Sequence, residues 1–257
     1  MSKIICCFCK KEGERAKEHI WPKWLQLELN SSTKKPHIGV HISVKGSHVI
    51  SKRNQTGETL VFGKVCKKCN NGWMSNLEGQ FKPIFLQLQK DNNLNSLSKS
   101  SRKLIADWSL KTAIMINAGS NYRKIIPLIH YDHLYKYKSL PRDVVIDLGF
   151  INSTEKLGWQ QSNINGIILK QSKFNEEKQA YSISDRSYVI TMQLNRLGIK
   201  VQYFENCKQR GYCVPLNQEN RLLRIWPYRK NSNINFSLAY ENIESMHADT
   251  LLKQKTS

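Results

Sequence analysis

Long apolar stretches are absent from this chain of 257 residues. No apolar run reaches the roughly 20 residues that a membrane span requires. The first residues, MSKIICCFCKK, also lack the apolar core of a signal peptide. We therefore expect no membrane segment and a cytoplasmic location. A composition of 40% hydrophobic and 23% charged residues excludes an intrinsically disordered chain and indicates a globular one.

Acidic residues are scarce. The 20 Asp and Glu face 40 Lys and Arg, which gives a formal net charge of +20. The excess is spread along the chain: +8 in residues 1–80 (14 basic, 6 acidic) and +12 in residues 81–257 (26 basic, 14 acidic). A basic surface favours polyanions, with nucleic acid ahead of an anionic membrane surface. Charge alone is also compatible with a surface that is basic only for solubility.

Cysteine is infrequent, with seven residues, yet four of them form two C-x-x-C pairs. The pairs are Cys6 with Cys9 and Cys66 with Cys69. In a reducing compartment such pairs indicate metal ligands before disulfides. Two pairs complete a tetrahedral, closed and therefore structural Zn²⁺ site. Cys7 is the one plausible substitute ligand.

The sequence predicts an α+β fold in two parts. The polar stretch DNNLNSLSKSS at 91–101 indicates a linker or exposed loop between a domain at 1–90 and one at 102–257. In the first part we expect a short helix from Pro22, strands within 38–50 and 59–62, a helix over 70–78, and another opened by Pro83.

In the second part, residues 100–119 predict a helix capped by Ser100 or Ser101 and ended by Gly119. Trp108 is expected in its core face and Lys111 on its flank. Strand patterns follow at 144–151, 188–194, 199–204 and 222–228, with a tight turn at Asn165-Gly166. These patterns favour a mostly antiparallel sheet with one or two helices packed on it.

Between the cysteine pairs stands KEHIWPKWL at 17–25, and two asparagines follow the second pair directly. The joint pattern C-x-x-C, E-H-I-x-P and C-x-x-C-N-N resembles the HNH nucleases, in the branch whose ββα-metal (His-Me finger) fold is pinned by four cysteines. The resemblance covers roughly residues 4–78. It rests on the four paired cysteines with Glu18, His19 and Asn70.

The resemblance implies a metal-dependent endonuclease. His19 would be the general base, because imidazole is neutral near pH 7 and can take a proton from water. Glu18 and Asn70 would offer oxygen ligands to a weakly held catalytic Mg²⁺ or Mn²⁺. Zinc would fix the loop that carries Glu18 and His19 against the helix that carries Asn70. Neighbours in a strand face opposite sides, so a bulge or irregular strand end is needed to turn both side chains toward one phosphate.

Some features depart from the family pattern or leave alternatives open. The acidic residue is Glu where many members have Asp, and the stretch from His19 to Cys66 must hold an insertion. Many members carry a middle Asn that orients the catalytic His, for which Asn54 is the nearest candidate. Asn70 could instead cap a helix, and Asn71 could share the ligand role. A second metal site at His37, His41 and His48 has no supporting spacing. Cys207 and Cys213 could bind a metal only with further partners, so we expect ordinary buried thiols there.

Our leading hypothesis is an endonuclease that hydrolyses phosphodiester bonds in DNA, with residues 102–257 selecting the target or a protein partner. The first alternative is a non-catalytic, zinc-stabilised nucleic-acid-binding protein. The second is an RNA-directed nuclease. Single-stranded RNA is commonly recognised by stacked aromatics, but aromatic residues are only 9% of the chain and no RNA-binding signature is present, so DNA ranks above RNA. The target sequence and the oligomeric state are left open.

Overall fold

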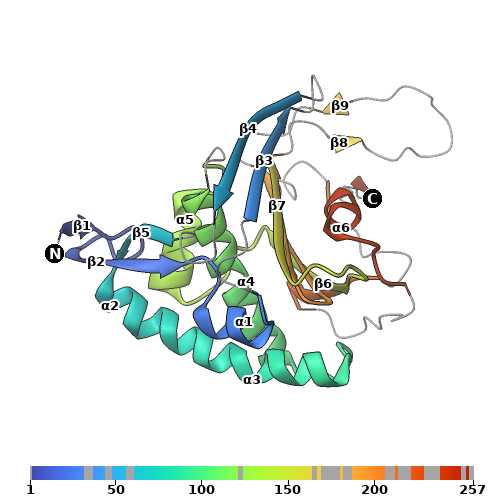
Figure 1. The fold of residues 1–257 in the computed structure, drawn as a ribbon, viewed down its shortest axis with the longest axis horizontal. Helices are drawn as coiled ribbons and strands as arrows, with labels where there is room; N and C mark the ends of the chain where they lie inside the picture. Colours follow the sequence, from blue (N-terminus) through green and yellow to red (C-terminus); the bar gives the residue numbers. More distant parts are fainter. Residues whose placement is uncertain are drawn as a thin grey trace.

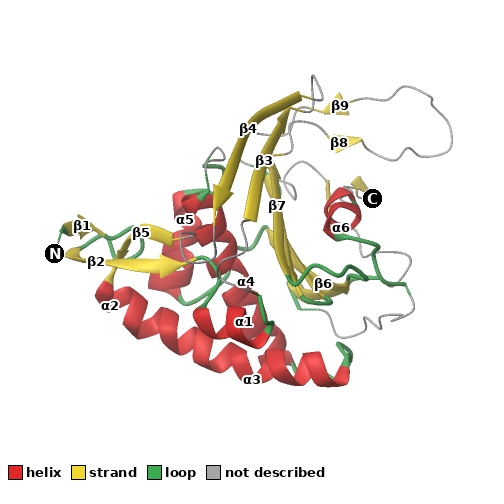
Figure 2. Ribbon diagram, viewed as in Figure 1, coloured by secondary structure: helices red, strands yellow, loops and turns green. Residues whose placement is uncertain are grey.

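The computed structural model describes residues 2–31, 37–43, 48–55, 61–120, 124–163, 167–168, 180–181, 187–205, 212–213, 221–228, 238–249 and 253–254. Runs of helices and runs of antiparallel strands follow one another along the chain, as the sequence predicts for an α+β protein (Figures 1 and 2). The predicted turn at Asn165-Gly166 and Cys207 lie outside the described residues.

The N-terminal part contains a three-stranded antiparallel sheet in the order β1-β2-β5. Its strands are β1 (Lys3–Ile5), β2 (Glu12–His19) and β5 (Val61–Cys66). The short helix α1 (Lys23–Glu28) follows β2 and begins after Pro22, as predicted. The predicted insertion between β2 and β5 contains a two-stranded hairpin of β3 (His37–Ser43) and β4 (His48–Gln55). Consequently β2 and β5 are far apart in sequence but hydrogen-bonded neighbours.

A nearly continuous helical segment follows β5. It consists of α2 (Lys67–Cys69), a π-helical turn η1 (Asn70–Met74) and the long helix α3 (Ser75–Asp91). The prediction that Pro83 opens a new helix is wrong, because Pro83 lies inside α3. Proline there removes the hydrogen bond to the carbonyl of Gly79, but both residues are exposed, so water can solvate that carbonyl. Phe81 and Phe85, both fully buried, hold the helix in place across the break.

The second part is built around α4 (Lys99–Gly119) and a five-stranded antiparallel sheet in the order β13-β6-β11-β10-β7. The strands are β6 (Val144–Phe150), β7 (Leu157–Asn163), β10 (Tyr188–Leu194), β11 (Leu197–Tyr203) and β13 (Leu223–Trp226). α4 contacts β11 and β13, whereas α6 (Ile243–Ala248) contacts β7, β10 and β11. β13 lies at the edge of the sheet.

The remaining elements are short. They are α5 (Leu128–Asp132), the π-helical turn η2 (His133–Tyr137), β8 (Ile167–Ile168), β9 (Ala180–Tyr181), β12 (Tyr212–Cys213) and β14 (Lys253–Gln254). The predicted linker connects α3 to α4, and Ser98 rather than Ser100 or Ser101 caps α4, since its hydroxyl accepts from the Ser101 N–H.

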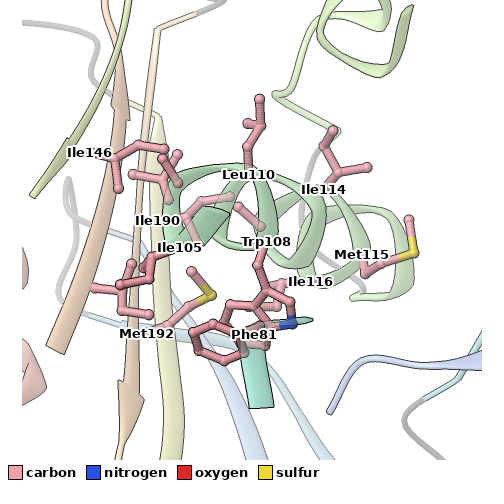
Figure 3. Close-up of a cluster of buried hydrophobic side chains, with 14 of the residues drawn as sticks. Phe81, Ile105, Trp108, Leu110, Ile114, Met115, Ile116, Ile146, Ile190 and Met192 are labelled. Atoms are coloured by element: carbon pink, nitrogen blue, oxygen red, sulfur yellow. The ribbon is translucent and has the colours of Figure 1, made fainter. Parts of the chain in front are cut away.

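One hydrophobic core includes residues from both parts of the chain. α4 lies at its centre and also contacts α3 and β5. Trp108 of α4 stacks on Phe81 of α3 with ring centroids 4.0 Å apart, and Ile146, Ile190 and the neighbouring sheet residues pack nearby (Figure 3). The domain boundary near residues 91–101 stays a prediction, because a single hydrophobic core contains buried residues from both sides of it.

Among the helices that the structure describes, none is long and apolar enough to cross a membrane.

Candidate active site and metal centre

The four paired cysteines come from two tight turns at one end of the three-stranded sheet. Cys6 and Cys9 lie in the turn between β1 and β2, where the N–H of Lys10 donates to the Cys6 carbonyl. Lys10 is left-handed, with φ of 58°. Cys66 ends β5 and caps α2, and its Sγ accepts from the Cys69 N–H at 3.5 Å. Because β2 pairs with β5, the two turns meet.

The four cysteine Sγ atoms lie within 4.8 Å of one another. The Sγ atoms of Cys9 and Cys66 are 3.8 Å apart. Four thiolates at the usual Zn–S distance of about 2.3 Å would be separated by about 3.8 Å in a tetrahedron. The donor set therefore fits Zn²⁺ in number, chemistry and separation. Cys7, the possible substitute, is not one of the four.

Backbone donors favour a thiolate at this centre. Burial alone would raise the pKa of the Cys6 thiol, but hydrogen bonds from the backbone of Cys66, Cys9 and Phe8 outweigh it and lower the pKa to about 7. Cys7 differs, because burial raises its pKa to about 12. Burial also raises the pKa of the Cys9 and Cys69 thiols, so Cys6 is the cysteine of the cluster whose pKa is lowered.

Glu18 and His19 end β2, and the pairing of β2 with β5 is irregular there. Ala16 pairs with Val65, but Glu18 pairs with Phe62, so the register shifts by one residue between them. The chain after His19 is anchored by buried Trp21, whose carbonyl accepts from the Gln26 side chain at 2.8 Å. The extra residue lies on β5, where Gly63 and Lys64 stand opposite Lys17, and β2 keeps its alternation of buried and exposed positions. The turning of both Glu18 and His19 toward one phosphate therefore stays a prediction.

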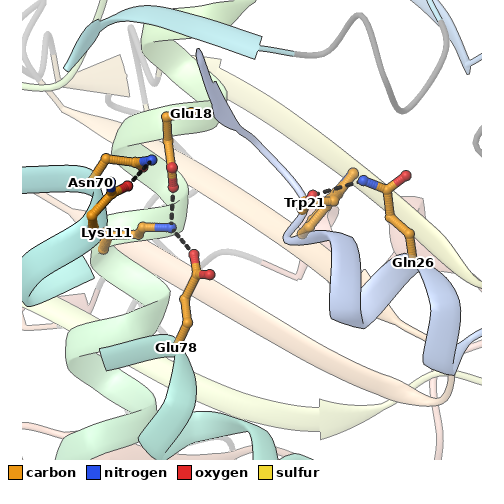
Figure 4. A network of polar contacts seen from close by, with 7 residues as sticks. Glu18, Trp21, Gln26, Asn70, Glu78 and Lys111 are labelled. Carbon is orange, nitrogen blue, oxygen red and sulfur yellow. Dashed lines mark hydrogen bonds and ion pairs between the residues drawn. The ribbon is translucent and has the colours of Figure 1, made fainter. Parts of the chain in front are cut away.

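The Glu18 side chain points inward to a lysine. Its Oε1 accepts a hydrogen bond from Lys111 Nζ of α4 at 2.8 Å. The same ammonium donates to Glu78 Oε1 of α3 at 2.5 Å. Figure 4 shows the two carboxylates reaching Lys111 from different directions. Lys111, which the sequence analysis places on the helix flank, is instead fully buried.

The charges in this cluster influence one another. Burial disfavours the ammonium of Lys111, but Glu18 and Glu78 outweigh it and raise the pKa of Lys111. Burial raises the pKa of Glu78, which Lys111 opposes; Glu18 adds a smaller upward effect and His19 a smaller downward one. The Glu78 carboxylate therefore lies within electrostatic reach of both Glu18 and His19.

Asn70 lies in the helical segment that follows the second cysteine pair, just before a kink. It is the first residue of the π-helical turn η1, which is kinked at Gly72. Its Nδ2 donates to Asn71 Oδ1 at 3.3 Å, so the two amides act as a pair.

The donor types of Glu18 and Asn70, one carboxylate and one amide, suit a hard cation such as Mg²⁺. One Glu18 oxygen is already bonded to Lys111, so the carboxylate would be shared between the two cations.

The sequence analysis did not identify Glu78 as a site residue, nor the pairing of Lys111 with Glu18 and Glu78. A signal was available, since Lys111 stands within the apolar run of α4, where an unpaired lysine is rarely buried. The side chains of Asn54, His37, His41 and His48 lie outside the described residues, as does that of Cys213.

No family model, curated protein or solved structure matches this chain. What the protein does is therefore inferred from its own residues.

Proposed function

We propose that the protein is a metal-dependent endonuclease of the HNH type that hydrolyses phosphodiester bonds in DNA. The observation that carries the proposal is the placement of Glu18 and His19 at the irregular end of β2, beside a strand whose continuation carries Asn70. Two antiparallel strands followed by a helix, with a four-cysteine cluster at their junction, is the arrangement that the sequence resemblance implies.

Each residue has a separate task in this proposal. The imidazole of His19 takes a proton from water as the water oxygen attacks phosphorus and the bond to the leaving oxygen breaks. Glu18 and Asn70 would hold Mg²⁺ or Mn²⁺, which supplies charge neutralisation at the phosphate when bound. The four cysteines hold Zn²⁺ and make no contact with substrate, because a closed site leaves no open position.

The direct test is cleavage of supercoiled plasmid with Mg²⁺, Mn²⁺ or neither, beside single-stranded DNA and RNA of matched length. We expect plasmid to be cut only with a divalent ion, and DNA to be cut faster than RNA. Cleavage of RNA alone would favour the RNA-directed alternative. No cleavage of any substrate with any divalent ion would contradict the proposal.

The ion pair of Glu18 with Lys111 gives specific support to the non-catalytic alternative, a zinc-stabilised nucleic-acid-binding protein. A carboxylate that already has a cationic partner is less free to bind metal. This alternative predicts tight nucleic-acid binding that does not change when Glu18 or His19 is replaced, together with no cleavage.

Glu18→Ala and Asn70→Ala should weaken the response to Mg²⁺, because each removes an oxygen ligand from a cation that binds few protein groups. We expect the Mg²⁺ concentration for half-maximal cleavage to rise about tenfold or more, with partial rescue by high Mg²⁺ or by Mn²⁺. Titrations of cleavage rate against metal concentration measure this. Glu12→Ala is a matched control, since Glu12 is an exposed carboxylate on the same strand, paired with Lys3. An unchanged Mg²⁺ response in both site variants would remove these residues from the metal site.

DNA binding should fall steeply with salt, because a chain at +20 displaces counterions from phosphates. For about 6–10 phosphate contacts, affinity should drop by about 10³–10⁵ between about 50 and 200 mM salt. Fluorescence anisotropy with labelled duplex, without divalent ions, gives the slope. A flat salt dependence would contradict a surface that binds phosphates.

A further inference from the structure

A fully buried lysine needs an explanation. Lys111 has no exposed side-chain surface, and a buried ammonium is costly unless it is paired and hydrogen-bonded. Its partners come from two other elements: Glu18 from β2 and Glu78 from α3. The cluster therefore joins the strand that carries His19, the helix that follows Asn70, and the central helix of the second part of the chain.

The charges of this cluster do not cancel. Two carboxylates and one ammonium leave one net negative charge next to the end of β2, where His19 also acts on Glu78. Glu18 and Glu78 are themselves partly accessible, with 9% and 19% of their side-chain surface exposed, whereas Lys111 is not. A cation from solvent can thus approach the carboxylates, but the ammonium already lies behind them.

We propose that Lys111 is a positioning residue of the site, which orients Glu18 and Glu78 and sets how tightly the site holds a divalent cation. The ammonium occupies one oxygen of Glu18, fixes the direction of the other, and repels a second cation bound there. Glu78 thereby becomes an acidic member of the site. This inference rests on the proposed function, in which Glu18 is a metal ligand.

The proposal predicts a direction of change in cation affinity that a purely structural ion pair does not predict. Removing the ammonium should make the site bind a divalent cation more tightly, because a repelling positive charge is lost. At a separation of roughly 5 Å, even a water-like dielectric constant of about 80 makes this repulsion worth about tenfold in affinity or more. A structural ion pair predicts lower stability with no gain in cation affinity.

The test is Mn²⁺ binding to the full-length, zinc-loaded protein, followed by electron paramagnetic resonance of free Mn²⁺ without nucleic acid. The measurement is made at about pH 8, so that the two carboxylates stay ionised once Lys111 is gone. We expect Lys111→Met to bind Mn²⁺ about tenfold more tightly than the unmodified protein, and Glu18→Gln to lose this binding. Lys103→Met, which removes an exposed lysine from the same helix, should leave the affinity unchanged.

Glu78→Gln provides a second route if Lys111→Met does not fold. It removes one negative charge and keeps the ammonium, so Mn²⁺ should bind about tenfold more weakly. A Lys111→Met affinity equal to or weaker than that of the unmodified protein, or an unchanged affinity in Glu78→Gln, overturns the inference.

The two proposals fail separately. If Mn²⁺ affinity changes as expected but no protein cuts nucleic acid, the role of Lys111 stands and the nuclease does not. If cleavage depends on His19 but Mn²⁺ affinity is unchanged by the substitutions of Lys111 and Glu78, the nuclease proposal stands and the role of Lys111 does not.

Discussion

Replacing Cys66 and Cys69 together by serine should release the zinc and unfold the N-terminal sheet. Structural Zn²⁺ contributes about 10–16 kcal/mol in zinc-finger peptides at neutral pH, which is as much as the whole stability of a typical domain, about 5–15 kcal/mol. The three strands β1, β2 and β5 offer only a small core of their own, and two of the four ligands begin the helical segment that follows. Elemental analysis should show about one zinc per chain before the substitution and none after it.

Cys7→Ser is the matched control for this experiment. Cys7 is adjacent to a ligand but is not one of the four, so its replacement should keep the zinc content unchanged. Hydrogen exchange reports the structural consequence, with loss of protection expected in residues 2–22 and 61–74 of the double variant. Zinc that persists in the double variant, or is lost from Cys7→Ser, would show that the metal lies elsewhere.

Local patterns predicted the elements whose signals are long and regular. The helix at 99–119 and the strands at 144–150, 188–194 and 197–203 appear close to where the sequence places them. Their apolar periodicity is sustained over many residues and agrees with how they pack. Pro83 shows the limit of such reasoning: a residue that usually starts or breaks a helix is carried inside α3, since Phe81 and Phe85 bury the opposite face.

The four-cysteine cluster was predictable, and the carboxylate cluster was not. Two C-x-x-C pairs specify four candidate ligands by spacing alone, and those four residues meet. The contact of Glu18 with Lys111 spans 93 residues and depends on α4 passing between the small sheet and the large one. No local pattern encodes that path, so a buried lysine is mistaken for one on the helix flank.

The irregular pairing near Glu18 could be predicted only in part. Adjacent strand residues face opposite sides, and in β2 the buried positions Ala16 and Glu18 alternate with exposed Lys17. Sequence chemistry can state that an irregularity is needed if Glu18 and His19 are to act together. The pairing of β2 with β5, which involves residues more than 40 positions apart, places a register shift between Ala16 and Glu18, with the extra residue on β5. It leaves the orientation of His19 relative to Glu18 a prediction.

His19→Ala should abolish cleavage while leaving zinc content, folding and DNA binding nearly unchanged. A general base contributes about 10²–10⁴-fold to rate, and alanine can accept no proton. His19 lies at the far end of β2 from the cysteines, because Arg15 pairs with Cys66 and His19 pairs with Val61. The loss should be present at every Mg²⁺ concentration, which distinguishes it from the metal-dependent defect expected for Glu18→Ala and Asn70→Ala.

Single-turnover plasmid cleavage across a Mg²⁺ and a Mn²⁺ titration measures the effect. His133→Ala is the matched control, because His133 lies in the turn η2, where its ring bonds to Ser139, and has no part in the proposed chemistry. We expect that control to cut at the rate of the unmodified protein. If His19→Ala also cuts at that rate, His19 is not the base, and any nuclease activity must come from other residues. If saturating metal restores His19→Ala, the residue supports metal binding, because a missing proton acceptor cannot be replaced by occupying Glu18 and Asn70.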